Sequence, residues 1–510
     1  MRAIIFITLI PSVFMGIGFP VANQLVQELR KEIGSRAGGL YLANTAGGVL
    51  GSLLTGLILL PTIGMKNTIG LLSIVVLLGL VPLVVDSKFS VLPKPHRLWR
   101  QASLVVATAV CLIWWLLPTE FLRDKIFFKP EERNKILLMS EGLNEILAIS
   151  KGEGDRLVLF TNGHKMSGTE LGDQRYMGAF VHVPLMQIQD PKAVLVICFG
   201  VGNTLHSASL YPSLENLEIV DLSKSILGHA DFFKKWNEGV LTDPRVHVFI
   251  NDGRQHLRMT ALEKFELITL DPPPIVYAGV SSLYSKEFYE LAKSRLKTGG
   301  YITQWFPINQ LPAEEGLALV RAFIDVFPDS VLLNGHHNTL MLMGRKDRSI
   351  EYDPQLAINL MNERPLASKN MHDVALDNVL EITGSFVATY KDMKQATEFV
   401  SPVTDDWPTM EYAHLAVMDH RIESNLFRVA NVFDWCPKCR SLTQTGEELE
   451  HLTTYLGVVN AWYGTRQYME YSNSRVIAKD KIDLPKSVGD VPGVIGRSKY
   501  LNMIFGKSIQ

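Results

Sequence analysis

The sequence predicts an α/β protein in which a parallel sheet covered by helices follows a small antiparallel sheet and a group of apolar helices. Two observations support this fold class. Between residues 192 and 306, apolar runs that end in Gly or Asp alternate with helical spacers, as in a parallel sheet. Uncharged apolar segments long enough to cross a bilayer occur only in the first 118 residues.

The composition limits the classes of function. The chain has 510 residues, which suits two or three domains. Its formal net charge is -2, so we expect no nucleic-acid partner. The hydrophobic fraction of 47% and the mean hydropathy of +0.12 are high for a soluble protein. Four cysteines in so long a chain do not form a disulfide framework.

About four transmembrane spans are predicted between residues 1 and 118, over the apolar segments 3–22, 38–62, 68–85 and 102–118. The second segment is rich in Gly, Ala and Ser at i and i+4 spacing, which lets helices pack closely in a membrane. Asn44 in this segment is either a hydrogen-bonding residue between helices or a lining residue. No transport motif is visible, so we expect the helices to anchor the rest of the chain.

The orientation of these helices is not fixed by the sequence. Basic residues in the loops 23–37 and 86–101 place both loops in the cytoplasm by the positive-inside rule. Four spans would then leave the C-terminal part outside, whereas the basic segment 119–135 argues for the cytoplasm. Either one segment is not a full span or a helix is missing at the N-terminus. We expect a multi-pass membrane protein whose soluble domain is cytoplasmic.

A linker and a small antiparallel β domain are predicted over residues 119–190. Short alternating strands at 135–140, 145–149 and 156–161 are separated by turn residues, which is a hairpin pattern. A helix is expected from about 173 to 183.

The core is predicted over residues 191–346. The run 193–198 has no polar residue, as expected for a strand buried on both faces. Gly200 and Gly202 follow it, and glycines at such a turn let the backbone approach a ligand closely. Turns often contain Gly-x-Gly, so this pair alone is a weak signal.

Acidic residues at the ends of the next strands strengthen the prediction of a ligand-binding site. Asp221, Asp252 and Asp271 follow the predicted strands 217–220, 246–250 and 265–270. In an open α/β sheet the carboxyl ends of the strands form the ligand-binding edge. Asp221 is placed to accept the ribose hydroxyls of a nucleoside, and Asp252 the exocyclic amine of an adenine. The alternative is that Asp221 and Asp252 only cap the following helices.

The remaining elements of the core are a helix over 284–297 that ends at Thr298-Gly299-Gly300, a strand over 301–305, a helix over 313–327 and a closing hairpin, 330–334 and 339–344. His336 and His337 lie in this hairpin and are interpreted as turn residues, so no metal site is expected.

Residues 347–510 are predicted to be a mostly helical extension, with an amphipathic helix in 445–475 and a loose tail in the last forty residues. Its Cys436 and Cys439 form a Cys-Pro-Lys-Cys motif, which supplies only two of the four ligands of a structural zinc. We favour a surface turn with two thiols over zinc binding or redox use.

Several motifs together carry a family resemblance, namely Val-Ile-Cys-Phe-Gly-Val-Gly-Asn-Thr (196–204), Asp-Pro-Arg-Val…Asn-Asp-Gly-Arg (243–254), Phe-Glu-Leu-Ile-Thr-Leu-Asp-Pro-Pro-Pro (265–274) and Leu-Tyr-Ser-Lys-Glu-Phe-Tyr (283–289). Over about residues 135–345 the chain resembles spermidine synthases, and more closely the bacterial membrane-fused spermidine synthase-like proteins. The resemblance implies a Rossmann-like S-adenosylmethionine-dependent transferase core. Relatives of the fused type carry more helices at the N-terminus, which implies that this chain is a truncated form.

The resemblance also implies an activity: aminopropyl transfer from decarboxylated S-adenosylmethionine to a small-molecule amine in polyamine biosynthesis, in a possible homodimer. Gly200, Gly202, Asp221, Asp252 and Gly253 would bind the donor. Asp271 matches the first aspartate of the Asp-x-x-Asp catalytic motif and would accept the proton of the amine. Tyr176 matches an active-site tyrosine and would bind substrate together with Asp271.

Three residues depart from the family pattern. Pro274 replaces the second aspartate of the catalytic motif, Val201 replaces an acid in the glycine loop, and Gly178 replaces an acid after the tyrosine. A buried diamine needs paired carboxylates, so the nucleoside half of the site is complete and the diamine half is not. The alternatives are therefore an S-adenosylmethionine-dependent methyltransferase with another acceptor, and a non-catalytic membrane protein that binds a nucleoside.

Overall fold

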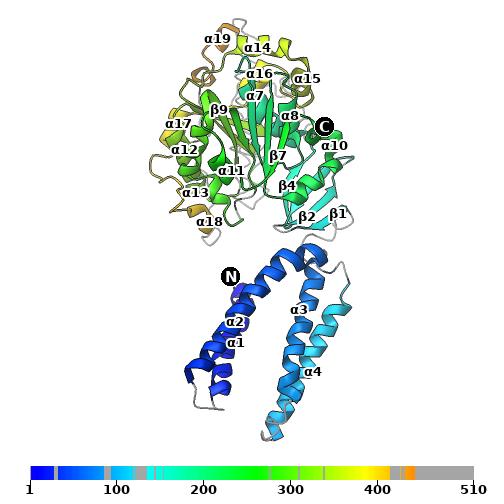
Figure 1. Ribbon diagram of the computed structural model, residues 1–510. Helices are drawn as coiled ribbons and strands as arrows, with labels where there is room; N and C mark the ends of the chain where they lie inside the picture. The colour runs from blue at the N-terminus through cyan, green and yellow to red at the C-terminus, as the bar shows by residue number, and fades with distance from the viewer. Residues whose placement is uncertain are drawn as a thin grey trace, which may run out of the picture. The chain divides into compact units, whose positions relative to one another are not determined.

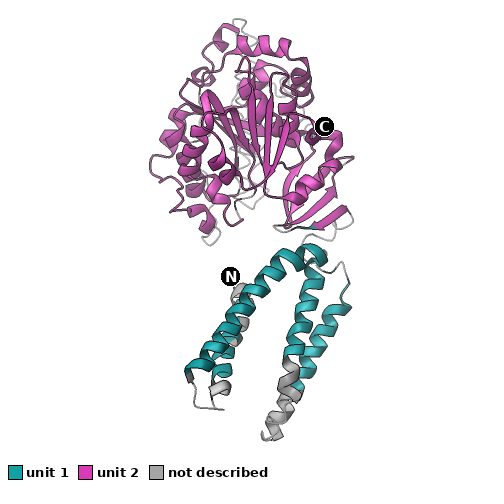
Figure 2. Cartoon of the chain, viewed as in Figure 1, with its two compact units in different colours: residues 1–125, 141–143 teal, residues 126–140, 144–510 magenta. Residues whose placement is uncertain are grey.

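The computed structural model describes residues 2–27, 33–85, 94–118, 121, 135–142, 145–152, 154–273, 275, 277–307, 310–336, 339–413, 426 and 431–442. The chain divides into two compact units, residues 1–125 with 141–143 and residues 126–140 with 144–510 (Figure 2). The small antiparallel sheet, the parallel core and the extension thus belong to one unit. The domain boundaries at residues 190 and 346 within this unit stay a prediction. Pro274, His337, the predicted helix 445–475 and the tail lie outside the described residues.

Unit 1 is helical, with α1 (Arg2–Gln27), α2 (Ile33–Leu54), a π-helical turn η1 (Thr55–Leu59), α3 (Leu60–Val85) and α4 (Lys94–Leu116) (Figure 1). The ring of Phe19 on α1 lies 5.7 Å from the ring of Tyr41 on α2. On α4, the Nε1 of Trp114 donates a hydrogen bond to the carbonyl oxygen of Lys66 on α3 at 3.0 Å. These contacts pair α1 with α2 and α3 with α4.

One helical stretch of the described residues, Gly34–Gly79, is long and apolar enough to cross a membrane. Its 46 residues include the predicted span 38–62 and most of the predicted span 68–85. Its backbone is not helical at Gly64, where φ is 76°. A continuous helix of that length would measure about 70 Å, more than twice the hydrocarbon core of a bilayer. The segment Ala102–Leu116 is apolar but shorter. The structure therefore supports one candidate stretch and does not show separate multiple spans.

Unit 2 begins with a four-stranded sheet in the order β1-β2-β3-β4 (Ile136–Glu141, Ile146–Lys151, Leu157–Thr161, His164–Gly168). The predicted hairpins correspond to β1–β3, and β4 was not predicted. β4 reads His-Lys-Met-Ser-Gly and has no apolar alternation, so only its antiparallel pairing with β3 makes it a strand. The long helix α7 (Leu171–Leu185) follows, two residues longer at each end than predicted.

The second sheet of unit 2 has eight strands in the order β12-β10-β11-β9-β8-β5-β6-β7. The bounds are β5 Ala193–Ile197, β6 Asn216–Asp221, β7 Val246–Ile250, β8 Phe265–Leu270, β9 Leu296–Pro307, β10 Ser330–His336, β11 Thr339–Arg345 and β12 Phe386–Thr389. The five strands from β5 to β9 are parallel to one another. β6 and β7 follow on one side of β5, whereas β8 and β9 lie on its other side, so the order of the strands reverses between β5 and β8. β10, β11 and β12 are antiparallel. This is the predicted Rossmann-like α/β arrangement.

The helices and short helical turns around this sheet are α8 (Asn203–Ser209), α9 (Lys224–Gly228), η3 (Ala230–Phe233), α10 (Lys234–Asn237), η4 (Val240–Thr242), α11 (Gly253–Met259), η5 (Val280–Leu283), α12 (Lys286–Arg295), α13 (Ala313–Val326), α14 (Pro354–Glu363), α15 (Pro365–Asp373), α16 (Val379–Thr383), α17 (Tyr390–Ala396), α18 (Thr409–Tyr412), η8 (Val432–Asp434) and α19 (Cys439–Leu442). Successive side chains of β5 alternate between two apolar clusters. Leu195 and Ile197 pack in the cluster that contains residues of α12 and α13. Val194 and Val196 pack in the cluster that contains residues of α7 and α8, which covers the other face (Figure 1).

The predicted helix end at Gly299-Gly300 is wrong. α12 ends at Arg295 and β9 starts at Leu296, so both glycines lie in the strand. Gly299 has φ of 82°, and the register with β8 shifts between the Leu296 and Tyr301 pairs, which is the pattern of a β-bulge. A Cβ on Gly300 would lie 3.0 Å from the backbone oxygen of Glu266, so the bulge requires glycine there.

The prediction that Cys436 and Cys439 are two thiols in a surface turn is also wrong. Cys436 and Cys439 are buried and joined by a disulfide bond. The segment is held inside unit 2 by its neighbour Trp435, whose ring stacks on Phe386 at 5.9 Å and whose Nε1 donates a hydrogen bond to the carbonyl oxygen of Ile350.

Candidate functional site

A cavity of about 440 Å³ lies at the carboxyl ends of β5, β6, β7 and β8. The residues that follow these strands line it, together with residues of β3 and β4 and the loop 277–283. It therefore coincides with the reversal of strand order between β5 and β8, where open α/β sheets bind their ligands. Of the predicted site residues, Gly200, Asp221, Asp252, Gly253 and Asp271 line the cavity.

The turn after β5 is a strained loop with three residues at positive φ: Cys198 at 74°, Gly200 at 56° and Gly202 at 89°. Gly200 lines the cavity, and a Cβ there would lie 3.1 Å from the Oγ of Ser167 on β4. Gly202 lies behind the turn, where a Cβ would meet the ring of Phe199 and the side chain of Asn237. Gly202 therefore shapes the loop without lining the cavity.

Asp221 is buried at the end of β6 and holds the glycine turn in place. Its Oδ2 accepts a hydrogen bond from the backbone N–H of Phe199 at 2.7 Å, and its Oδ1 accepts one from that of Ser223 at 2.8 Å. Burial raises the pKa of Asp221 to about 6, and the two backbone N–H groups oppose that rise. Each carboxylate oxygen can still accept a further bond, so the geometry is compatible with two ribose hydroxyls.

Asp252 caps a helix and also lies in the lining of the cavity. Its side chain accepts a hydrogen bond from the backbone N–H of Gln255 at 2.8 Å and so caps α11, and it also lines the cavity. Gly253 is the first residue of α11, and a Cβ there would overlap the side chain of Ile197 at the end of β5. The glycine therefore lets the helix approach the strand beside the cavity.

Asp271 follows β8, and its Oδ2 accepts a hydrogen bond from the hydroxyl of Tyr176 on α7 at 3.1 Å. Burial raises the pKa of Asp271 to about 7, with a smaller lowering effect from the Tyr176 hydrogen bond and a raising effect from Asp173. Burial, and then the negative charge of Asp271, raise the pKa of Tyr176 well above its usual range, so the tyrosine stays a hydrogen-bond donor. A carboxyl group that titrates near neutral pH suits proton acceptance.

Sequence reasoning missed two further acids. Glu145 lines the cavity beside Asp221, and its Oε1 accepts a hydrogen bond from the hydroxyl of Ser223 at 2.5 Å. Asp173 on α7 lies near Tyr176 and Asp271 and forms an ion pair with Lys165 at 3.2 Å. No local signal identifies either residue, because the packing of the small sheet and of α7 against the core brings them to the site.

The charged residues that line the cavity are all acids. Among its described lining residues, Glu145, Asp221, Asp252 and Asp271 are the charged ones, and none is Lys, Arg or His. The rest of the lining is mostly apolar, including Leu159, Met166, Met177 and Ile197. Such a surface favours a ligand with net positive charge and disfavours a carboxylate or a phosphate.

The loop 277–283, which forms one wall of the cavity, is held by the segment 401–413 of the extension. The Oε1 of Glu411 accepts hydrogen bonds from the N–H of Gly279 at 2.9 Å and from the hydroxyl of Ser281 at 2.5 Å. Arg254 of α11 donates a bidentate pair of bonds to Asp405, at 2.6 and 2.5 Å, and also contacts the carbonyl oxygen of Ser282. We call these contacts of Asp405 and Glu411 the clasp.

The described residues contain no group of three or more His, Cys, Asp or Glu side chains that could hold a metal ion.

The fold and the cavity together define a Rossmann-like α/β protein whose acidic cavity lies at the edge of the sheet where such folds bind their ligands. Residues 173–308 match the model of the spermine/spermidine synthase domain.

Three relatives illustrate the sequence similarity. The chain is 30% identical over 142 residues to the polyamine aminopropyltransferase of Sulfurisphaera tokodaii, a match that covers 28% of this chain and 47% of that protein. Identity to the polyamine aminopropyltransferase of Saccharolobus solfataricus is 33% over 144 residues, with coverage of 28% and 48%. Putrescine N-methyltransferase 2 of Nicotiana attenuata is 30% identical over 134 residues, with coverage of 26% and 36%. The chain spans about half the length of the aminopropyltransferases that it matches.

Among solved structures, spermidine synthase from Thermotoga maritima aligns with a TM-score of 0.38 and 20% identity, covering 44% of this chain and 77% of that one. A spermidine synthase in complex with the transition state analogue AdoDATO aligns with a TM-score of 0.37 and 21% identity, with the same coverage.

Proposed function

We propose that the protein is a membrane-anchored aminopropyltransferase of the spermidine synthase type. It would transfer the aminopropyl group of decarboxylated S-adenosylmethionine to a small-molecule amine, as in polyamine biosynthesis. The domain at residues 173–308 and its similarity to polyamine aminopropyltransferases support the class of reaction.

The observation that carries the choice of donor is the charge of the cavity. Decarboxylated S-adenosylmethionine has a sulfonium and an ammonium group and no carboxylate. S-adenosylmethionine has a carboxylate, which would meet the acids Glu145, Asp221, Asp252 and Asp271 with no basic side chain among the described lining residues. An uncompensated carboxylate in such a cavity would be costly, so the decarboxylated donor is the better ligand.

In this reaction, Asp271 accepts the proton of the attacking amine. The amine nitrogen forms a bond to the propyl carbon next to the sulfonium, and the carbon–sulfur bond breaks. Its electron pair leaves with the sulfur, and methylthioadenosine is released as a neutral thioether. Tyr176 holds the carboxylate of Asp271 through the hydrogen bond of 3.1 Å. Positioning of the two reactants in line supplies much of the remaining rate enhancement.

The donor would be bound by the residues predicted from the sequence. We propose that Asp221 accepts the ribose hydroxyls, that Asp252 accepts the adenine amine, and that Gly200 and Gly253 keep the cavity wall free of side chains. Gly202 contributes by shaping the turn. Of the departures from the family pattern, Val201 and Gly178 are buried and neither is among the lining residues. The described lining residues thus do not identify a particular diamine, so we propose an amine as the acceptor without naming which one.

A second candidate function is methyl transfer from S-adenosylmethionine to an amine. The similarity to putrescine N-methyltransferase 2, at 30% identity, favours it. The two functions share the nucleoside half of the cavity and differ in the donor.

Membrane anchoring is proposed from the stretch Gly34–Gly79 and from the exposure of large apolar side chains in unit 1. Leu42 on α2 is 72% exposed, Val76 on α3 is 64% exposed and Leu116 on α4 is 82% exposed. So large an apolar surface suits contact with lipid. We also propose a multi-pass arrangement, a cytoplasmic location for the soluble domain and a homodimer.

Calorimetric titration of the full chain in detergent micelles tests the proposal. Decarboxylated S-adenosylmethionine, S-adenosylmethionine and methylthioadenosine are titrated separately. We expect the decarboxylated donor to bind at least about tenfold more tightly than S-adenosylmethionine, which corresponds to about 1.4 kcal/mol. Preference for S-adenosylmethionine would exclude the first function and favour methyl transfer. Failure of all three ligands to bind would exclude both enzyme functions.

A further inference from the structure

The disulfide between Cys436 and Cys439 has no role in the proposed transfer reaction. It joins two cysteines three residues apart, whereas Cys111 and Cys198 are free thiols. A disulfide stabilises a fold mainly by closing a long loop in the unfolded chain, and a separation of three residues closes almost none. The bond therefore contributes less to stability than a disulfide that closes a long loop. The Cys-x-x-Cys spacing is that of cysteine pairs that are reversibly oxidised and reduced.

Both cysteines are buried, but only one of them lines a cavity. Cys436 is fully buried, follows the packed Trp435 and donates its backbone N–H to the carbonyl oxygen of Val432 at 2.8 Å. Cys439 lines a second cavity, of about 490 Å³, whereas Cys436 is not among its lining residues. A molecule in this cavity would therefore contact Cys439 before Cys436.

The cavity beside Cys439 has the size and lining of a site for a small molecule. Its volume of about 490 Å³ lies within the usual range of ligand pockets, roughly 300–1,000 Å³. Met361, Met371 and Leu380 form an apolar part, Asn362 and Asn378 add amide groups, and Asp377 adds one carboxylate. Thioether and aliphatic side chains suit a sulfur-containing ligand, and the amides can bind peptide groups.

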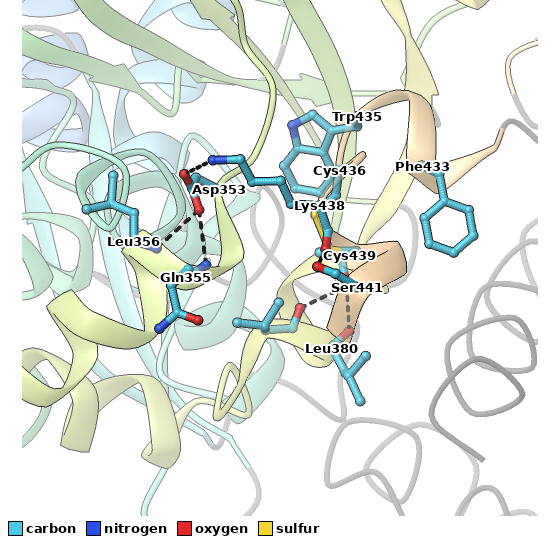
Figure 3. The surroundings of a disulfide bond; sticks show 12 residues. Asp353, Gln355, Leu356, Leu380, Phe433, Trp435, Cys436, Lys438, Cys439 and Ser441 are labelled. Atoms are coloured by element: carbon cyan, nitrogen blue, oxygen red, sulfur yellow. Dashed lines mark hydrogen bonds and ion pairs between the residues drawn. A yellow bond between two sulfur atoms is a disulfide. The ribbon is translucent and has the colours of Figure 1, made fainter. Parts of the chain in front are cut away.

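Two basic residues, Lys438 and Arg440, are sequence neighbours of the pair. Lys438 lies between the cysteines in the sequence, and its side chain reaches the carboxylate of Asp353 (Figure 3). Arg440 follows Cys439, and its guanidinium lies 5.0 Å from the ring of Phe433. Lys438 lowers the pKa of Asp353 through its hydrogen bond, which keeps that ion pair charged. Nearby cations stabilise a thiolate, which is both the nucleophile and the leaving group in thiol–disulfide exchange.

We propose that Cys436 and Cys439 form a thiol–disulfide exchange site for a low-molecular-weight thiol that binds in the cavity. The thiolate of the ligand attacks the Sγ of Cys439, a new sulfur–sulfur bond forms, and the Cys436–Cys439 bond breaks with its electron pair on the Sγ of Cys436. Cys436 then takes up a proton, which balances the proton that the ligand thiol lost when it formed its thiolate. A second thiolate attacks the ligand sulfur of the mixed disulfide, which releases the oxidised ligand and leaves Cys439 as a thiolate.

The electrons balance in this cycle. The protein disulfide gains two electrons and becomes a dithiol, while two ligand thiols lose two electrons and become one disulfide. The reverse reaction, with the oxidised ligand as oxidant, restores the Cys436–Cys439 bond. Cys439 is thus the sulfur that exchanges with the ligand, and Cys436 is the buried resolving sulfur.

Trapping of the mixed disulfide tests this proposal. The full chain in detergent micelles is incubated with oxidised glutathione in one arm and with cystine in another. Excess reagent is quenched with acid, and peptide mapping locates the adducts. In Cys436→Ser we expect a stable adduct on Cys439 because no resolving thiol is left. In the matched variant Cys439→Ser we expect at least about tenfold less adduct on Cys436, because this sulfur is away from the cavity.

The wild-type protein gives the second readout. In mixtures of reduced and oxidised glutathione we expect the native pair to open and close reversibly, with two alkylated thiols in the reduced form. Asn362→Trp, at an exposed position on the cavity lining, should slow exchange with glutathione, and the neighbouring Glu363→Trp, which does not line the cavity, should not.

Three results would overturn the proposal, and the first two concern the cysteines themselves. One is equal adduct formation in the two single-cysteine variants, and the other is a disulfide that glutathione opens only after denaturation. Opening by a protein dithiol alone, with no adduct from glutathione or cystine, also rejects the small-molecule site. Circular dichroism spectra and thermal melting, compared with those of the wild type, show in each case that the variant is folded.

Discussion

Asp271 is the residue on which the proposed reaction depends, and its pKa of about 7 sets a pH dependence. The carboxyl is protonated below that pH and cannot accept a proton, so kcat/KM should rise as the pH rises through about 7. Titration of the amine substrate adds a separate rise at higher pH, near its own pKa of about 10.

Tyr176→Phe separates these two titrations. The hydroxyl of Tyr176 lowers the pKa of Asp271, so its removal should raise that pKa and move the lower limb of the profile to higher pH. The rise at higher pH, which reflects titration of the amine substrate, should occur at the same pH in both proteins. Steady-state kinetics of both proteins over the same pH range measure the shift, and identical profiles would show that Asp271 is not the titrating group.

Replacement of Asp271 by Asn should remove turnover and keep the donor site. We expect kcat to fall by at least about 10²-fold, because a positioned general base contributes about that much. Donor affinity by calorimetry should change little. A variant with full activity would contradict the role of Asp271 as base.

The same substitution has a consequence for stability. In the folded protein the pKa of Asp271 is raised above its usual 3.8, so the folded state binds more protons than the unfolded state between these two values. Stability from this group is complete below about pH 4 and is lost as the pH rises through about 7. Asp271→Asn should therefore melt at a higher temperature than the wild type at about pH 8 and at nearly the same temperature at about pH 4. A constant difference in melting temperature would contradict the raised pKa.

At the scale of elements, the clasp fixes the loop 277–283 over the cavity. Glu411→Gln removes the charge from the bonds to Gly279 and Ser281, so the loop should spend less time in the binding position. We expect the donor Kd to rise roughly tenfold, since hydrogen bonds to charged groups contribute about 1.5–3 kcal/mol. Glu398→Gln, at an exposed position outside the clasp, is the control. Equal affinities of the two variants would show that the clasp does not order the loop.

The sequence predicted those elements whose pattern is local. The bounds of β7 and β8 agree with prediction. Asp221 at the end of β6, Asp252 after β7 and Asp271 after β8 lie around one cavity, because parallel strands end at one edge of the sheet. The glycines at 299 and 300 were misinterpreted because a helix end and a β-bulge both require glycine. Glu145, Asp173 and Glu411 could not be predicted as neighbours of the site, because tertiary packing brings them there from distant parts of the chain.

At the scale of the whole molecule, the proposed anchor predicts how the chain fractionates. The apolar stretch Gly34–Gly79 should keep the full chain in the membrane pellet after an alkaline carbonate wash, which removes peripheral proteins. Immunoblotting of the pellet and the supernatant measures this. Release of the chain by the wash would contradict membrane insertion.

A competition between the two donors tests the central claim most directly. The full chain is incubated with a mixture of amines and equal concentrations of decarboxylated S-adenosylmethionine and S-adenosylmethionine, and the products are identified by mass spectrometry. The acidic cavity around Asp271 predicts an aminopropylated amine together with methylthioadenosine, and no product in Asp271→Asn. A methylated amine together with S-adenosylhomocysteine would contradict the proposed transfer.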